Sequence, residues 1–192
     1  MRFKIFYLSL LLFSFAVTIR AIGCEDNWID ATEVGLGCLQ FHPTEMTWWE
    51  ASKYCQEPRI TLKVHYVYIS LSSLMFLLCK CEVYMILGQD QRTHLVEVMT
   101  SEQMEVLVEL MNHEAGPGQN TWWSGATDIG REGAWIWAYS LLPVGDFIWY
   151  LGGPNGGTGE NYMCFADGYD YMGADCFTDY AYAKPICQKS IN

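Results

Sequence analysis

Residues 122–137 read Trp-Trp-Ser-Gly-Ala-Thr-Asp-Ile-Gly-Arg-Glu-Gly-Ala-Trp-Ile-Trp and carry the strongest fold information in the chain. They predict a strand, a turn and a second strand. Gly125 leaves room for a close backbone approach within the first strand. Residues that favour the turn follow: Asp128, Gly130 and Gly133. Side chains alternate along a strand, so Trp135 and Trp137 should share one face and Ile136 the other.

A helix is predicted to begin after Thr47. Thr47 followed by Glu50 three residues later is the pattern of a capping box, in which each side chain satisfies a backbone N–H of the other. Trp48, Ala51 and Cys55 then fall on one face of the helix. This pattern indicates an amphipathic helix with its apolar face turned to a core.

These patterns together resemble the C-type lectin-like domain. That family has a Trp-Ile-Gly-Leu strand followed by Glu-Gly-x-Trp-x-Trp; residues 123–126 stand for the first motif and residues 132–137 match the second closely. The spacing of aromatic, alanine and cysteine over residues 49–55 resembles the family's first helix. The resemblance covers about residues 24–57 and 91–192. It implies an α+β fold, with two helices flanking small antiparallel β-sheets and a long loop region.

The resemblance also implies three disulfides. The long form of the domain begins with a cysteine-linked hairpin, which here is expected over residues 24–41. The cysteines pair in the family's scheme as Cys24 with Cys38, Cys55 with Cys187, and Cys164 with Cys176. The remaining two cysteines, Cys79 and Cys81, have no place in that scheme.

Two further core elements are predicted between these cysteines. Residues 94–98 form an apolar strand pattern, and Thr100 with Gln103 suggests a second capping box. The helix that follows carries apolar residues at helical spacing, which indicates a core-facing stripe. Its members are Met104, Leu107, Val108 and Met111.

The N-terminal residues have the pattern of a signal peptide. Arg2 and Lys4 precede an apolar run over residues 5–17, and this run is too short to span a membrane. Cleavage after Gly23 or after Ala21 would leave small residues at the cleavage site, as signal peptides require. We therefore expect residues 1–23 to be a signal peptide, residues 24–192 to be the lectin-like domain, and the protein to be secreted and extracellular.

An anomalous apolar insert interrupts the domain at about residues 58–90. Its apolar run over residues 64–79 is shorter than a spanning helix and is broken by Lys80. Three interpretations stay open: a membrane hairpin, a structured insertion, and a retained intron in a predicted gene. The composition of the segment differs from the rest of the chain and favours the intron. Sequencing of the transcript across codons 57 to 91 would distinguish them.

The charge of the chain restricts its partners. Without the first 23 residues and the insert, the sequence holds 5 basic and 20 acidic residues, a formal net charge of −15. Such a surface argues against nucleic acid and anionic membranes as partners, and we expect no membrane insertion. The partner implied by the resemblance is a glycan or a cell-surface glycoprotein.

The long loop over residues 151–160 is where sugar-binding relatives hold calcium. Their ligands are Glu-Pro-Asn or Gln-Pro-Asp, a further Glu, and the Asn-Asp of a Trp-Asn-Asp motif. Here Pro154, Asn155 and Glu160 remain, but Gly153 replaces the first ligand. The Trp-Asn-Asp positions hold Tyr171, Met172 and Gly173, while Asp167 lies nearby.

The resemblance therefore implies a carbohydrate-recognition protein with a degenerate calcium site. Any Ca²⁺ would rest on Asn155 and Glu160, with Asp170 or Asp175 as compensating oxygen ligands. The alternative is a calcium-independent protein-binding module of the same fold. We expect no enzyme, because the four histidines lack metal spacing and no Gly-x-Ser-x-Gly motif occurs.

Overall fold

A computed structural model describes residues 24–57, 93–117 and 120–190. The two helices are α1 (Trp48–Gln56) and α2 (Ser101–Glu114). The strands are β1 (Ile29–Ala31), β2 (Gly37–Phe41), β3 (Thr93–Leu95), β4 (Thr121–Thr127), β5 (Ile136–Trp137), β6 (Tyr162–Ala166), β7 (Gly173–Cys176) and β8 (Lys184–Lys189). Four short 3-10 helices complete the described part: Thr32–Val34, Asp146–Ile148, Gly157–Gly159 and Asp167–Tyr169. The predicted α+β class is confirmed.

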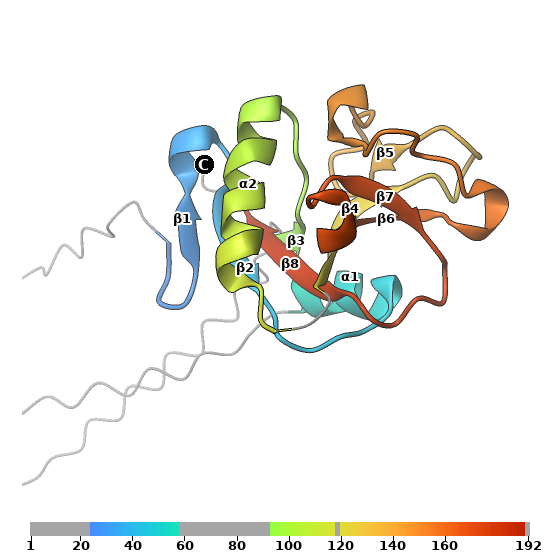
Figure 1. The fold of residues 1–192 in the computed structure, drawn as a ribbon. Coiled ribbons are helices and arrows are strands. Elements are labelled where there is room, and N and C mark those ends of the chain that lie inside the picture. The colour runs from blue at the N-terminus through green and yellow to red at the C-terminus, as the bar shows by residue number, and fades with distance from the viewer. Residues whose placement is uncertain (1–23, 58–92, 118–119, 191–192) are drawn as a thin grey trace, which may run out of the picture.

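Strand β8 joins the two halves of the sheet. It pairs antiparallel with β2 on one side and with β3 on the other, and its start pairs parallel with β4. The order along the sheet is β1-β2-β8-β4-β6-β7, and β5 pairs with β4. The hairpin β1–β2 and the C-terminal end of the domain lie at one end of the molecule, and the region of β5, β6 and β7 lies at the other (Figure 1).

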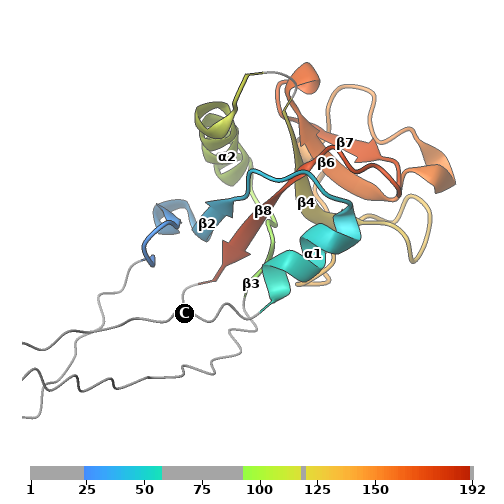
Figure 2. The same ribbon diagram turned by 90° about the horizontal axis from the view of Figure 1, so that it is seen from below.

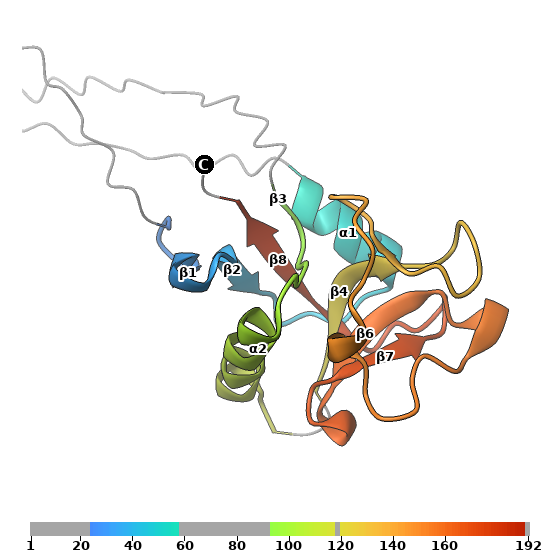
Figure 3. The same ribbon diagram turned by 90° about the horizontal axis from the view of Figure 1, so that it is seen from above.

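The two helices lie on opposite sides of strands β8 and β4 (Figures 2 and 3). Neighbouring residues of β4 therefore enter different cores. Trp122 packs with the residues beneath α2, whereas Trp123 packs with Trp48 and the rest of the α1 face. Because both faces are covered, every residue of β4 is buried. This arrangement explains why two consecutive tryptophans are tolerated in one strand.

The hairpin predicted from residues 122–137 is confirmed. Ala126 pairs with Trp137 across β4 and β5, and Trp137 is buried while Ile136 is exposed. Gly125 donates its N–H to the carbonyl of Val96 at 2.8 Å, and a Cβ at position 125 would lie 2.9 Å from the Leu95 carbonyl oxygen. The glycine is therefore required by the close approach of two backbones.

The predicted capping box of α1 is confirmed. At α2 only the bond to the Thr100 side chain forms, and the predicted return bond from Gln103 is wrong. The Thr47 side chain accepts the N–H of Glu50, whose carboxylate accepts the N–H of Thr47 at 2.9 Å. In α2 the Thr100 hydroxyl accepts the N–H of Gln103 at 3.2 Å. The Gln103 amide, however, turns away and bonds Met99 N–H at 2.7 Å and the Val34 carbonyl at 3.1 Å. A bond to the neighbouring hairpin replaces the local cap.

The three predicted disulfides are confirmed, and they join Cys24 with Cys38, Cys55 with Cys187, and Cys164 with Cys176. The strand predicted over residues 94–98 is shorter than expected, because β3 ends at Leu95. Val96 still donates its N–H to Ile186 at 2.9 Å, but the N–H of Glu97 is taken by the Gln188 side chain. The Gln188 side chain thus replaces the backbone partner that would have continued the β-ladder.

Two predictions fall on residues that the structure does not describe. These are the signal peptide over residues 1–23 and the insert at about 58–90 with Cys79 and Cys81. Within the described ranges, none of the helices is both long enough and apolar enough to cross a membrane.

Candidate functional site

The long loop is fastened at its start to the edge strand β7 and at its end to the segment that follows β7. Tyr150 donates its N–H to the Gly173 carbonyl at 2.9 Å, and Thr178 donates its N–H to the Gly159 carbonyl at 3.3 Å. The peptide bond between Gly153 and Pro154 is cis. The loop forms part of the end of the domain that lies away from the β1–β2 hairpin (Figure 1).

Three of the candidate residues come together beside this loop. One carboxylate oxygen of Asp175 accepts the backbone N–H of Asn155 at 2.6 Å and also the backbone N–H of Gly156. A side chain at position 156 would collide with the carboxylate of Glu160. Partial burial and the negative charge of Asp175 raise the pKa of Glu160, so the two carboxylates are close neighbours. We call Asn155, Glu160 and Asp175 the loop cluster.

An aromatic pair supports the loop cluster. The Asn155 side-chain amide donates to the Tyr150 hydroxyl at 2.7 Å and to the Gly152 carbonyl at 3.2 Å. The Tyr150 ring stacks on Tyr169 with 4.4 Å between ring centroids. The amide of Asn155 is therefore held with its carbonyl oxygen free of these two bonds, beside an exposed aromatic surface.

Asp170 closes a turn at the start of the segment between β6 and β7. It follows the 3-10 helix Asp167–Tyr169 in a left-handed conformation, and its N–H donates to the Asp167 carbonyl at 3.1 Å. The Asp167 carboxylate accepts the N–H of Asn120 at 2.9 Å and so holds the start of β4. Tyr171 and Gly173, at positions where relatives carry a ligand motif, are buried.

The loop cluster does not fit a complete calcium site. Ca²⁺ takes about six to eight oxygen ligands. The cluster offers the Asn155 carbonyl oxygen, the Glu160 carboxylate and the second oxygen of Asp175, and residue 153 is a glycine. Within the described ranges, no group of three His, Cys, Asp or Glu residues is placed to hold a metal ion. What the cluster can offer a ligand is hydrogen-bond acceptors beside an aromatic pair.

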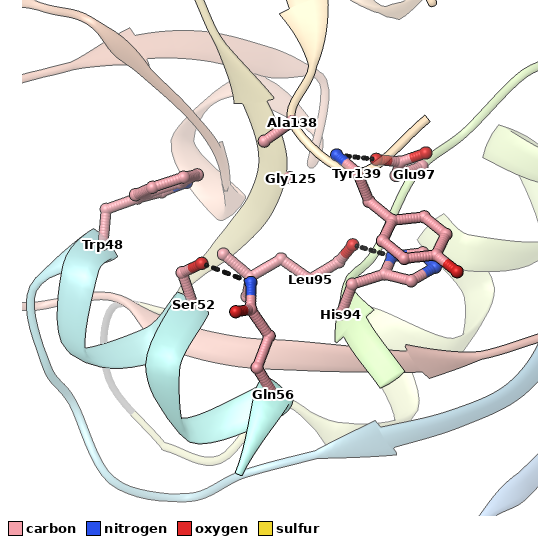
Figure 4. A pocket seen from close by; sticks show the side chains of 9 residues that line it. All are labelled: Trp48, Ser52, Gln56, His94, Leu95, Glu97, Gly125, Ala138 and Tyr139. Carbon is pink, nitrogen blue, oxygen red and sulfur yellow. Dashed lines mark hydrogen bonds between the residues drawn. The ribbon is translucent and has the colours of Figure 1, made fainter. Parts of the chain in front are cut away.

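A second feature is a pocket of about 140 Å³ between α1, β3 and the turn after β5 (Figure 4). His94 and Glu97 line it, and both are buried although they are polar. The His94 imidazole stacks on Tyr139 with ring centroids 3.8 Å apart. One oxygen of Glu97 accepts the N–H groups of Tyr139 at 2.8 Å and Ser140 at 3.1 Å, which fixes the turn.

His94 is expected to make the domain sensitive to mild acid. Burial lowers the pKa of His94 from its ordinary value of 6.5, against the opposing effects of the Leu95 carbonyl and the Glu97 charge. Below that value the unfolded chain binds a proton that the folded chain does not bind. Stability is therefore lost as the pH falls, by at most about 1.4 kcal/mol at about pH 5.5.

Urea unfolding at about pH 7.5 and pH 5.5 measures this effect. The difference in unfolding free energy between the two pH values should largely disappear in His94→Gln. It should persist in His113→Gln, which changes an exposed histidine of α2. A parent protein with equal stability at the two pH values, or a difference that persists in His94→Gln, would contradict the assignment.

The sequence did not reveal two parts of these sites. Tyr150 carries no signal of its role, because nothing in the local sequence pattern shows that its hydroxyl reaches Asn155. The pocket was also missed, since its walls come from segments that only folding brings together. The single available signal was a histidine and a glutamate inside an apolar strand pattern, at positions 94 and 97.

Comparisons with known proteins identify the fold. No protein-family profile and no curated protein sequence matches the chain. Among solved structures, the carbohydrate-recognition domain of the mouse scavenger receptor C-type lectin has a TM-score of 0.59 and 20% identity, covering 88% of this chain and 100% of that one. The C-type lectin CEL-I from Cucumaria echinata has a TM-score of 0.59 and 22% identity, covering 88% and 99%.

A calcium-independent type II antifreeze protein is similar to the same degree, with a TM-score of 0.59 and 19% identity over 88% of this chain and 95% of that one. Identities this low carry the fold and not the activity. The hairpin of residues 122–137, the two helices and the three disulfides agree with that fold. The chain therefore contains a domain of the C-type lectin-like fold.

Proposed function

We propose that this protein is a secreted, non-enzymatic recognition module that binds a glycan at the long loop and has a degenerate calcium site. The loop cluster is the observation that carries the proposal. Asn155, Glu160 and Asp175 meet at the edge of the sheet, where their oxygens can accept hydrogen bonds from sugar hydroxyls. The stacked rings of Tyr150 and Tyr169 supply an aromatic surface next to these acceptors.

Secretion is supported by the covalent structure. Three disulfides join the described residues, and such bonds persist in oxidising compartments. The N-terminal pattern over residues 1–23 fits export. Binding rather than catalysis is the role that the similar solved lectin structures favour.

Replacement of the loop acceptors tests the glycan site. We expect Asn155→Ala with Glu160→Ala to reduce glycan binding by at least tenfold, or about 1.4 kcal/mol, because two hydrogen-bonding side chains are lost. Binding is measured on a glycan array and then by calorimetry with the best glycan. The matched control is Asn112→Ala with Glu105→Ala, which removes the same residue types from the exposed side of α2. Equal losses in both double variants would argue against the loop as the site.

Calcium is expected to add little to stability. A ligand bound at 100 times its dissociation constant adds about 2.7 kcal/mol, which is a shift of several degrees for a domain of this size. Because the loop cluster lacks a full set of ligands, we expect millimolar Ca²⁺ to shift Tm by less than about 1 °C relative to chelator. Differential scanning calorimetry measures this directly. A shift of several degrees that Glu160→Ala abolishes would show that the loop recovers the missing ligands.

The second candidate is calcium-independent binding of a protein. Exposed aromatic side chains favour it, since aromatic residues are enriched at protein interfaces. Trp49, Phe177 and Tyr182 are more than half exposed, at 58%, 58% and 69%. Binding to a surface glycoprotein that survives both deglycosylation and the loop variant would support this candidate over the first.

A further inference from the structure

We propose that the pocket between α1, β3 and the turn after β5 is a second binding site, which receives one arginine or lysine side chain of a partner protein. The pocket shares no residue with the loop cluster, so the proposal is independent of glycan binding. Figure 4 shows its walls: Trp48, Ser52 and Gln56 from α1, His94 and Leu95 from β3, and Ala138 and Tyr139 from the turn.

The size of the pocket suits the end of one side chain. Pockets for drug-sized ligands usually hold about 300–1,000 Å³, whereas this one holds about 140 Å³. That volume corresponds to a few water molecules at about 30 Å³ each. A guanidinium or ammonium group with part of its aliphatic stem fits such a space, whereas a folded peptide segment is too large for it.

Two side chains of the pocket, His94 and Glu97, offer hydrogen-bond acceptors to a ligand. The Nδ1 of His94 lies 2.8 Å from the Leu95 carbonyl oxygen, which can only accept, so Nδ1 carries the proton. Burial lowers the pKa of His94 and keeps the ring neutral, which leaves Nε2 as an acceptor. Within the described ranges, Nε2 has no hydrogen-bond partner.

Glu97 adds a charged acceptor. One of its oxygens is used by the N–H groups of Tyr139 and Ser140. The other oxygen accepts no hydrogen bond from the described residues, and it is not among their fully buried atoms without a partner, so a ligand in the pocket can reach it. A carboxylate in such surroundings gains most from a cationic hydrogen-bond donor, because charge-assisted bonds are about twice as strong as neutral ones.

The remaining walls favour the same ligand. Trp48 and Tyr139 offer aromatic rings, and aromatic faces attract guanidinium and ammonium groups. Gln56 donates its amide N–H to the Ser52 hydroxyl at 3.2 Å, which leaves its carbonyl oxygen as a further acceptor. The described residues carry 4 basic and 20 acidic side chains, a formal net charge of −16, so the domain as a whole attracts cations.

The test uses small probes and the full chain. ¹⁵N-labelled protein is titrated with Nα-acetyl-arginine amide and Nα-acetyl-lysine amide, and Nα-acetyl-citrulline amide serves as the uncharged probe of matched shape. We expect saturable shifts of the Tyr139 and Ser140 amides and of the His94 ring nitrogens with the two cationic probes. Citrulline should bind at least tenfold more weakly than arginine.

Two variants locate the site. Glu97→Gln keeps an acceptor for the turn but removes the charge, and it should weaken the arginine probe at least tenfold. Glu105→Gln makes the same charge change on the exposed side of α2 and should leave binding within twofold. Gln56→Arg, at an exposed helix position, supplies a guanidinium from the protein itself and should block the probe.

Gln56→Arg tests the pocket even if Glu97→Gln fails to fold. The proposal is overturned if citrulline binds as tightly as arginine. Equal binding by Gln56→Arg and the parent protein would also overturn it, as would equal binding by a folded Glu97→Gln.

Discussion

Replacing Cys55 and Cys187 together by alanine is expected to lower the free energy of unfolding by about 5 kcal/mol. The disulfide links residues 132 apart, so its loss frees a long closed loop in the unfolded chain. It also ties α1 to β8, the strand that joins the two halves of the sheet. A loss of this size equals the whole stability of many domains, and the protein should be largely unfolded at 37 °C.

Removal of the N-terminal disulfide is the matched comparison. Cys24 and Cys38 lie 14 residues apart, and the same chain-entropy argument gives about 3 kcal/mol for their bond. Urea unfolding of both double variants under non-reducing conditions measures the difference. A larger loss in the Cys24/Cys38 variant than in the Cys55/Cys187 variant would mean that native packing, not loop closure, governs the effect.

Trp123→Ala is expected to lower stability by about 3–5 kcal/mol, because a buried aromatic side chain leaves a cavity that its neighbours fill only in part. Trp123 is fully buried in the core beneath α1. Its indole N–H also donates to the Met46 carbonyl at 2.8 Å, which joins β4 to the segment before α1. For a domain of this size, Tm should fall by roughly 10–20 °C.

Trp49 provides the control, since it is the same residue type at 58% exposure on the first turn of α1. Trp49→Ala should cost less than about 1 kcal/mol. Circular dichroism melting of the two variants gives the comparison. Similar losses would show that Trp49 also contributes to the core, through its edge contact with Tyr162.

The local elements of the fold could be predicted because their causes are local. Alternation along residues 135–137 follows from strand geometry, and the capping box of Thr47 and Glu50 spans only three residues. The disulfide pairs came from resemblance to a family, since the eight cysteines of the chain allow 105 pairings. Resemblance to the family also identified three loop residues, Pro154, Asn155 and Glu160. It did not identify the side chains that surround them.

Contacts between distant segments could not be read from the chain. Gln103 looked like a capping residue, yet its amide bonds Val34, 69 residues away. Glu97 looked like one polar residue in a strand, yet it fixes a turn 42 residues further on. In both cases the side chain bonds to a partner on another element and not to a local one. Which partner is available depends on which helices, strands and turns lie side by side after packing.

The amino-acid sequence thus determined most of the strands, helices and turns, because propensity, capping and alternation act over a few neighbours. Packing determines the two candidate sites, because each is assembled from separate segments. Asp175 meets Asn155 only when the long loop folds onto β7, and His94 meets Tyr139 only when the turn after β5 closes over β3. Burial then changes the chemistry of these groups: it raises the pKa of Glu160 and lowers that of His94.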